Sequence, residues 1–420
     1  MSTYKKRIID KVIDRRLKNK GAILIEGAKG SGKTTCAEQH AASVLYLSDP
    51  ENLQLADISP KKLLEGASPR LIDEWQLALK LWDAVRFEVD HREGFGHFIL
   101  TGSALPVETS EIHHSGTGQF VWLKMRPMSL YESGESNGEI SLSDLFLNPK
   151  GEFFSTNKLN LDDLAFLTCR GGWPQATSFS GDSALDQAFD YNDAVLHTDL
   201  FHSDSVNRDI EKVKRLMHSY ARHQGTQATI SSLSVETRLN RETVTTYINA
   251  LRRIFVIEDM CAWNPNLRSK TAIRSSDTRY FVDPSIATAS LGIGPNDLIN
   301  DLNTFGLLFE TLCVRDLRVF ADALNATVYH YRDKSGLECD AVIHLRDGSY
   351  GLIEIKLGGD RLIEEGVTNL KKLSSLIDTT KMKKPSFLMV LTGTSPYAYK
   401  RDDGVFIVPI GCLKIERNNE

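Results

Sequence analysis

The sequence predicts an α/β protein of two or three domains, and three observations along its 420 residues support this. An apolar segment, a glycine-rich turn and a helical pattern follow one another over residues 22–42, as in one unit of a parallel sheet. Two helical patterns separated by a tight turn, then a strand, occupy residues 231–260. A hairpin signal precedes GLIEIKLGG, residues 351–359, which is an apolar strand interrupted by two charges.

Composition predicts a folded, soluble protein, since 41% of residues are apolar and 25% are charged. No run approaches the roughly 18 to 20 apolar residues of a membrane helix, and the basic start lacks the apolar core of a signal peptide. We therefore expect a cytoplasmic protein with no membrane contact. The six cysteines show no CxxC pair and no recognised Cys/His ligand spacing, which argues against structural zinc and a disulfide framework.

Charge is unevenly distributed along the chain. The net charge is −5, yet residues 1–20 hold eight Lys/Arg against two acids, and residues 207–280 hold thirteen against seven. Separate basic surfaces on an acidic body suggest a polyanion partner, with a solvated face that binds nothing as the alternative.

The glycine-rich turn over residues 27–34 reads GAKGSGKT and fits G-x-x-x-x-G-K-[ST] in full. Its backbone N–H groups can surround phosphates, Lys33 can neutralise their charge, and the Thr34 hydroxyl can ligate Mg²⁺. The pattern predicts binding of ATP with Mg²⁺. The predicted nucleotide contacts are Gly27, Ala28, Lys29, Gly30, Ser31, Gly32, Lys33, Thr34 and Thr35.

Two further strands are expected to complete this site. RLIDEWQ, residues 70–76, offers Asp73 for the metal and Glu74 to orient and deprotonate the attacking water. HFILTGSA, residues 97–104, ends in Thr101 and Ser103, either of which can sense the γ-phosphate or close the strand as a hydroxyl turn.

The order of motifs over residues 5 to about 410 resembles that of prokaryotic AAA-type ATPases with a C-terminal domain of unknown function and a PD-(D/E)xK, restriction-nuclease-like core. The matching segments include KRIIDKVIDRRL, the P-loop, LIDEWQ, FILTGSALP, MRPMSLYESG, RGGWP, YFVDPSIA, FGLLFETLCVRDL and LIEIKLG. The resemblance implies a five-stranded parallel ATPase core, a helical lid across about 160–205, and an arginine finger from a neighbouring protomer of a homo-oligomeric ring or partial ring.

One position departs from the family pattern. HHSGTGQ places Gln119 where the family usually has arginine. Glutamine cannot neutralise charge in the phosphoryl-transfer transition state, so slow turnover or a different finger is expected. Arg126 and Arg170 are the remaining candidates for a finger or sensor.

The middle segment predicts a helix-turn-helix with a wing. Val244, Ile248, Leu251 and Phe255 form one apolar face, behind Asn240 as N-cap. The exposed face is a candidate for DNA binding, with a rigid spacer or subunit contact as the alternative. The candidate DNA contacts are Arg241, Thr245, Asn249, Arg252, Arg268 and Lys270.

The C-terminal hairpin can bring Asp340 opposite Glu354, with Lys356 on the same face. Two carboxylates can share Mg²⁺ while the ammonium orients a water. Glu310, on a helix whose positions 305, 308, 309 and 312 pack inward, matches the first-helix acid of such nucleases. Nucleic-acid binding without cleavage and a structural ion pair remain alternatives.

These predictions combine into an AAA-type ATPase with lid (1–205), a winged helix (206–295) and a nuclease-like α/β domain (296–420). The expected function is that of an ATPase that acts on DNA, with Mg²⁺-dependent nuclease activity of the C-terminal domain as a further hypothesis. A nucleotide switch on a partner protein and a DNA-binding regulator are the alternatives.

Overall fold

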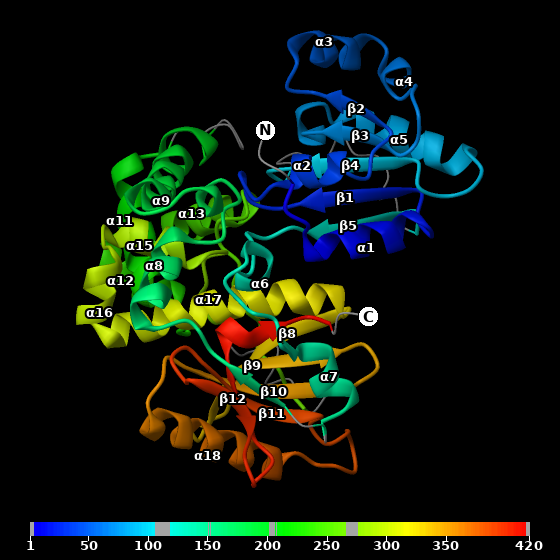
Figure 1. Ribbon diagram of the computed structural model, residues 1–420. Coiled ribbons are helices and arrows are strands. Elements are labelled where there is room, and N and C mark those ends of the chain that lie inside the picture. The colour runs from blue at the N-terminus through cyan, green and yellow to red at the C-terminus, as the bar shows by residue number, and fades with distance from the viewer. Residues whose placement is uncertain are drawn as a thin grey trace. The chain divides into compact units, whose positions relative to one another are not determined.

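The computed structural model describes residues 4–105, 118–149, 151, 153–200, 206, 208–265 and 276–416. The chain divides into two compact units (Figure 1). Unit 1 comprises 1–127, 197–208 and 249–256, and unit 2 comprises 128–196, 209–248 and 257–420. In the described part, no helix combines the length and apolarity that crossing a membrane requires.

Unit 1 contains the five-stranded parallel sheet that the resemblance implied. The strand order is β2-β3-β4-β1-β5, and every pair is parallel. The elements are α1 (Ile8–Leu17), β1 (Ala22–Glu26), α2 (Lys33–Glu38), β2 (Ser43–Tyr46), α3 (Pro50–Ile58), α4 (Pro60–Leu63), β3 (Arg70–Asp73), η1 (Trp75–Leu77), α5 (Lys80–His91), β4 (Phe98–Gly102) and β5 (Phe120–Lys124).

The strands of this sheet are largely apolar because helices cover both faces. One face packs against α5 through Trp82 and Val85, and the other against α1 and α2 through Ile13 and Cys36. Strand β4 lies between β1 and β3, so the carboxyl ends of these three strands share one edge. Ligands of parallel α/β sheets bind at such an edge.

Unit 2 contains a seven-stranded mixed sheet in the order β7-β12-β13-β11-β10-β9-β8. Its strands are β7 (Phe154–Thr156), β8 (Ala326–Arg332), β9 (Glu338–Leu345), β10 (Tyr350–Lys356), β11 (Phe387–Thr392), β12 (Tyr397–Lys400) and β13 (Phe406–Pro409). A second, two-stranded sheet pairs β6 (Ile140–Ser141) with β14 (Leu413–Lys414).

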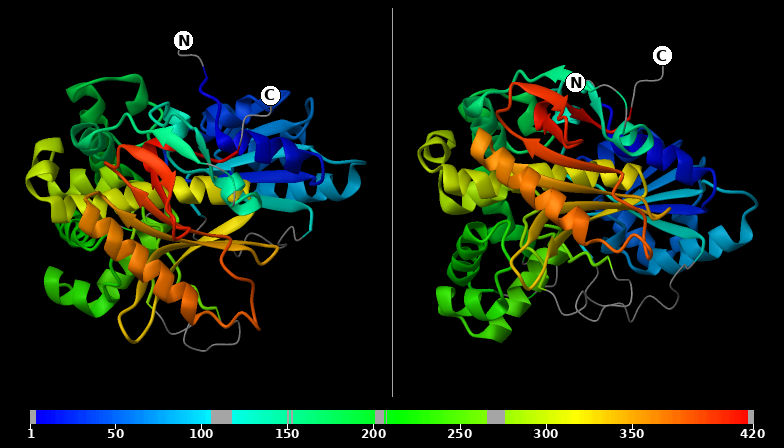
Figure 2. Two further views of the ribbon diagram at one scale, coloured as in Figure 1. Left: turned by 60° about the horizontal axis from the view of Figure 1, so that its bottom comes forward. Right: turned by 90° about the horizontal axis from the view of Figure 1, so that it is seen from below.

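Two sets of helices stand out in unit 2. Helices α8, α9, α11, α12, α15 and α16 pack together in one helical region, whereas α17 and α18 lie on opposite faces of the large sheet (Figures 1 and 2). The helices wholly within unit 2 are α6 (Leu130–Ser133), α7 (Leu142–Leu147), α8 (Leu161–Arg170), η2 (Ala176–Ser178), α9 (Asp182–Ala194), α11 (Ile210–Arg222), α12 (Ile230–Thr237), α15 (Pro284–Leu291), α16 (Pro295–Asn300), α17 (Leu302–Ala323), α18 (Asp360–Leu376) and η4 (Ile410–Cys412). Two more, η3 (Val195–Asp199) and α13 (Arg241–Arg253), begin in unit 2 and end in unit 1.

The predicted hairpin is present. Strands β9 and β10 are antiparallel, and Gly348 has φ 84° in the turn between them. Helix α17 buries the four predicted positions, including Phe305 and Leu312. The two strands pair as far as Ala341 and Ile353, after which β9 continues beside β8. The sheet therefore opens just where Asp340, Glu354 and Lys356 stand.

Residues after position 127 depart from the predicted boundary at 205. Strand β7 pairs with β12, and β6 pairs with β14, so residues 140–141 and 154–156 belong to the sheets of unit 2 and not to the ATPase sheet. These strands are two or three residues long, too short for sequence periodicity to reveal which sheet they join. Among the predicted DNA contacts, Arg268 and Lys270 lie outside the described residues.

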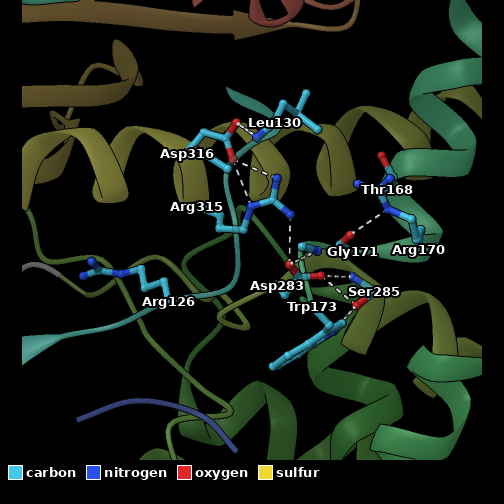
Figure 3. Close-up of polar contacts among 12 residues, drawn as sticks. Arg126, Leu130, Thr168, Arg170, Gly171, Trp173, Asp283, Ser285, Arg315 and Asp316 are labelled. Atoms are coloured by element: carbon cyan, nitrogen blue, oxygen red, sulfur yellow. Dashed lines mark hydrogen bonds and ion pairs between the residues drawn. The ribbon is translucent and has the colours of Figure 1, made fainter. Parts of the chain in front are cut away.

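A buried ion network ties together motifs that lie far apart in sequence (Figure 3). The Arg315 guanidinium, 2% exposed, bonds Asp283 at 2.9 Å and Asp316 at 2.8 Å. Asp316 also accepts from the Leu130 N–H at 2.9 Å, and Asp283 from the Gly172 N–H at 3.0 Å. This network links α17, the start of α15, the RGGWP turn and α6.

The RGGWP glycines are required by this packing. Gly171 has φ +71°, and a Cβ there would meet Asp283 Oδ1 at 2.4 Å. A Cβ on Gly172 would meet the Met128 carbonyl at 2.1 Å. Side chains at either position would push the network apart.

Replacing Arg315 with methionine should destabilise unit 2 by about 3–5 kcal/mol, because Asp283 and Asp316 would keep buried charge without a partner. The midpoint of urea unfolding, followed by circular dichroism, measures this. The matched control is Arg332→Met, which removes an exposed pair with Glu338 and should cost less than about 1 kcal/mol. Equal effects of both substitutions would contradict the role given to Arg315.

Candidate functional site

The P-loop joins β1 to α2 through backbone that only glycine adopts easily. Gly27 lies so close to β5 that a Cβ would meet the Met125 carbonyl oxygen at 2.0 Å. Gly32 caps α2 with φ 94°, in the left-handed region. The loop can therefore turn its N–H groups toward a phosphate at the start of α2.

Lys33 is buried at the first position of α2. Its ammonium donates to the carbonyl oxygens of Gly27 and Ala28 at 2.9 and 3.0 Å. Burial lowers the pKa of Lys33 to about 8, against the opposing effect of the Glu74 and Asp73 charges. The side chain is held ready to exchange backbone carbonyls for phosphate oxygens.

Thr34 and Asp73 meet as the motif spacing predicted. The Thr34 hydroxyl donates to Asp73 Oδ1 at 2.7 Å, across 39 residues of sequence. The Thr101 hydroxyl of β4 donates to the same oxygen at 2.6 Å. A hydroxyl beside a carboxylate is a hard oxygen pair that suits Mg²⁺, so Thr34 and Asp73 fit the predicted metal site.

Glu74 follows directly and is held in a defined position. Its backbone has φ 57°, which is strained for a residue with a side chain and is typical of functional sites. Its Oε2 accepts from the Ser103 hydroxyl at 2.7 Å and from the Gln76 amide. Ser103 therefore contacts the predicted catalytic base directly, a contact that neither of its predicted roles, γ-phosphate sensor or hydroxyl turn, describes.

Sequence reasoning missed two residues that support this site. The Gln76 side-chain amide donates to Glu74 and, at 3.3 Å, to the Ser103 hydroxyl. The other atom of that amide, Oε1, is buried without a hydrogen-bond partner. Arg7 donates from its guanidinium to the P-loop carbonyl of Ser31 at 2.9 Å and to that of Arg126 at 2.8 Å. The position of Gln76, two residues after Glu74, could have indicated from sequence that it contacts the predicted base. No sequence pattern indicated that Arg7 would contact the P-loop.

The remaining predicted nucleotide contacts differ in exposure. Lys29 and Thr35 are exposed, and Lys29 pairs with Asp199 at 3.0 Å. The Ser31 hydroxyl is buried and lacks a hydrogen-bond partner. Gly30 has φ 77°, as a tight loop requires.

The arginine candidates are occupied by other contacts. Arg170 belongs to unit 2, where its side chain is 6% exposed and pairs with Glu135 at 2.5 Å. Its guanidinium also donates to the Gly171 carbonyl at 3.1 Å. Arg126 is buried within unit 1. The Gln119 carbonyl accepts from the Gly21 N–H, which is a backbone role. In this conformation a buried, paired Arg170 is unsuited to act as a finger.

The predicted helix-turn-helix pattern is present as α12 and α13. The Asn240 side chain caps α13 by accepting from the Thr243 N–H at 2.7 Å, and Val244, Ile248 and Leu251 are fully buried. Arg241, Thr245 and Asn249 are exposed, and Arg252 is half-buried. Short antiparallel bridges join Ile257 to Phe281 and Met260 to Thr278 after the helix. The assignment of a winged helix stays a prediction.

The structure brings Asp340, Glu354 and Lys356 together at the opening between β9 and β10. The Lys356 ammonium pairs with Glu354 Oε2 at 2.6 Å and with Asp340 Oδ2 at 3.1 Å. The Ile355 N–H donates to Asp340 at 2.7 Å, in the place where a backbone partner would otherwise stand. Burial raises the pKa of Glu354, and its Oε1 is buried without a partner.

Glu310 approaches the same group from α17. It is half-buried beside Gly225 and accepts a hydrogen bond from the Tyr280 hydroxyl. Burial raises the pKa of Glu310 well above its ordinary value, and the nearby Asp340 charge adds to the shift. In the described residues, the three carboxylates do not form a group whose ligand atoms all lie within 4.8 Å. That all three bind one ion stays a prediction.

Comparison with known proteins places family boundaries on the chain. Residues 19–134 match the model of the AAA domain. Residues 161–297 and 305–413 match two domains of unknown function, DUF8612 and DUF4143. The DUF8612 match spans the boundary predicted at 205, and no curated protein matches the chain significantly.

One solved structure is a Signal Transduction ATPase with Numerous Domains (STAND) protein with a tetratricopeptide repeat sensor from Pyrococcus horikoshii. It is 12% identical over 77% of this chain and 48% of its own, with a TM-score of 0.22. This chain therefore spans about half the length of that protein, and so low a TM-score supports no inference.

The pKa of Lys33 predicts how ATP affinity depends on pH. ATP binds the charged ammonium, so its affinity should be constant well below pH 8 and fall above it as Lys33 loses its proton. Affinity at pH 9 should be about tenfold lower than at pH 7. Isothermal titration measures this, with Lys33→Arg as the control because its guanidinium stays charged and its profile should be flat. A flat profile for the unmodified protein would contradict the prediction.

Proposed function

We propose that this chain, whose residues 19–134 match the AAA domain and whose residues 305–413 match DUF4143, is an ATPase that hydrolyses ATP to act on DNA. The observation that supports hydrolysis best is the meeting of Thr34 with Asp73 at 2.7 Å, directly before Glu74. Phosphate-binding loop, metal-binding oxygens and a water-activating carboxylate then stand at one edge of the parallel sheet.

Each residue has a distinct part in the proposed reaction. Lys33 and the P-loop N–H groups bind the β- and γ-phosphates. Thr34 and Asp73 would hold Mg²⁺, which when bound neutralises phosphate charge. Glu74, oriented by Ser103 and Gln76, accepts the proton of the attacking water. A positive side chain to stabilise the transition state is expected from a neighbouring protomer, so a homo-oligomer is part of the proposal.

The DNA component is supported by the exposed face of α13. Arg241, Thr245 and Asn249 project from a helix whose other face is buried, within a segment of net positive charge. Such side chains can reach phosphates or base edges, and the positive charge of the segment favours phosphate contacts. A switch acting on a partner protein is the alternative, and an ATPase rate that ignores DNA would favour it.

The C-terminal site is proposed as a second, Mg²⁺-dependent centre for phosphodiester cleavage. Glu354 supports this, since its Oε1 is buried and unpaired although its other oxygen bonds Lys356. A buried oxygen without a partner is costly, and a cation would supply one. Asp340 and Glu354 would hold the ion, and Lys356 would orient a water.

Glu74→Gln should retain ATP binding and lower the hydrolysis rate at least about 100-fold, because the amide cannot take a proton. Lys33→Ala should lose nucleotide binding, whereas Lys80→Ala, at an exposed lysine of α5 outside the site, should keep it. Rates are measured with no DNA and with single-stranded, duplex and branched DNA, where DNA should stimulate the unmodified protein. Normal hydrolysis by Glu74→Gln would refute the assignment of the base.

The same reactions, analysed on denaturing gels with Mg²⁺ or with EDTA, test the tail. Asp340→Asn and Lys356→Ala should each abolish strand scission and leave the ATPase rate unchanged. Asp347→Asn, in the exposed hairpin turn, is the control and should cleave normally. If the unmodified protein does not cleave any of these DNAs with Mg²⁺, the nuclease proposal fails while the ATPase proposal stands.

A further inference from the structure

Helices α1 and α2 bring a histidine, a cysteine and a carboxylate together beside the P-loop, and none of these groups takes part in the proposed reaction. Asp10 lies on α1, Cys36 on α2, and His40 two residues after α2 ends. Asp10 Oδ1 is 3.1 Å from Cys36 Sγ and 3.1 Å from His40 Nε2. Cys36 is fully buried and Asp10 is 4% exposed.

The three atoms are spaced as ligands of one metal ion. Nε2, Sγ and Oδ1 all lie within 4.8 Å of one another, and theirs is the only such group in the described residues. Ligands about 2.0 to 2.3 Å from a tetrahedral Zn²⁺ stand roughly 3.3 to 3.8 Å apart. Shifts of a few tenths of an ångström would therefore admit the ion.

A second carboxylate orients the histidine. Asp14 Oδ1, one turn after Asp10 on α1, bonds His40 Nδ1 at 2.8 Å. Metal-binding histidines commonly engage a carboxylate through the nitrogen that does not bind the ion, which directs the other nitrogen to it. Here that other nitrogen is Nε2, which faces Asp10.

Hydrogen bonding alone is the competing explanation. A charged His40 between Asp10 and Asp14 would satisfy both carboxylates, and the Tyr4 hydroxyl also donates to Asp10 at 2.8 Å. A thiol is a weak donor, however, so Cys36 adds little to such a network, whereas its thiolate is a strong ligand for zinc-class ions. Asp10, a Cys36 thiolate and neutral His40 would balance the charge of a divalent ion.

We infer that Asp10, Cys36 and His40 form a binding site for a zinc-class transition-metal ion, with Asp14 as the positioning residue for His40. On binding, Cys36 releases its thiol proton to solvent and His40 presents the Nε2 lone pair. The ion would clasp α1 to the helix that begins with Lys33, in addition to the Arg7 contact with Ser31.

Cobalt titration of the reduced full-length protein, without nucleotide, tests the site. Co²⁺ should bind one per chain and give a near-ultraviolet thiolate-to-cobalt charge-transfer band that Zn²⁺ abolishes. Cys36→Ser should lose the band, while Cys261→Ser, at the exposed cysteine, should keep it. His40→Gln should keep the thiolate but weaken binding, and Asp14→Asn should weaken it about 10- to 100-fold.

Three results would overturn the inference. They are no band at one equivalent of Co²⁺, a band that survives Cys36→Ser, and a band that Cys261→Ser removes. Circular dichroism establishes that each variant is folded. Should Cys36→Ser not fold, unchanged Co²⁺ affinity in both His40→Gln and Asp14→Asn would refute the site.

Discussion

The need to pair every charge that leaves water shapes both units of this protein. Removing an ion from water costs several kcal/mol, and only close, well-oriented partners offset that cost. Arg315 lies between Asp283 and Asp316, Lys356 between Asp340 and Glu354, and Asp73 accepts from two hydroxyl groups. These pairings hold segments together that lie far apart in sequence, so they determine how the motifs assemble.

The two candidate sites use this constraint in different ways. At the P-loop, the Lys33 ammonium donates to two backbone carbonyls that phosphate oxygens could replace. At the C-terminal opening, Lys356 occupies the space between two carboxylates, and one Glu354 oxygen remains unpaired. The P-loop arrangement lets Lys33 exchange backbone carbonyls for phosphate oxygens. At the C-terminal opening, Lys356 would have to move before a cation could bind between Asp340 and Glu354.

The RGGWP and FGLLFETLCVRDL motifs acquire a structural explanation from the same constraint. Arg170, considered from sequence as a finger, is buried against Glu135, and the glycines beside it allow Asp283 to approach. Arg315 and Asp316 occupy one side of α17, while Glu310 faces the C-terminal acids. A single helix therefore contributes to the packing of unit 2 and to its candidate site.

The sequence by itself determined the P-loop, the capped helix α13 and the D…ExK hairpin, because each depends on local spacing and periodicity. The five-stranded parallel sheet was implied by the family resemblance. Only the tertiary structure decided which sheet β7 joins, that Arg170 is buried in an ion pair, and that Gln76 and Ser103 share Glu74. It also brought Asp10 to Cys36 across 26 residues and to His40 across 30, although the cysteine spacing predicts no metal site. Such contacts depend on how helices and strands pack, and one chain's order of residues does not encode those distances locally.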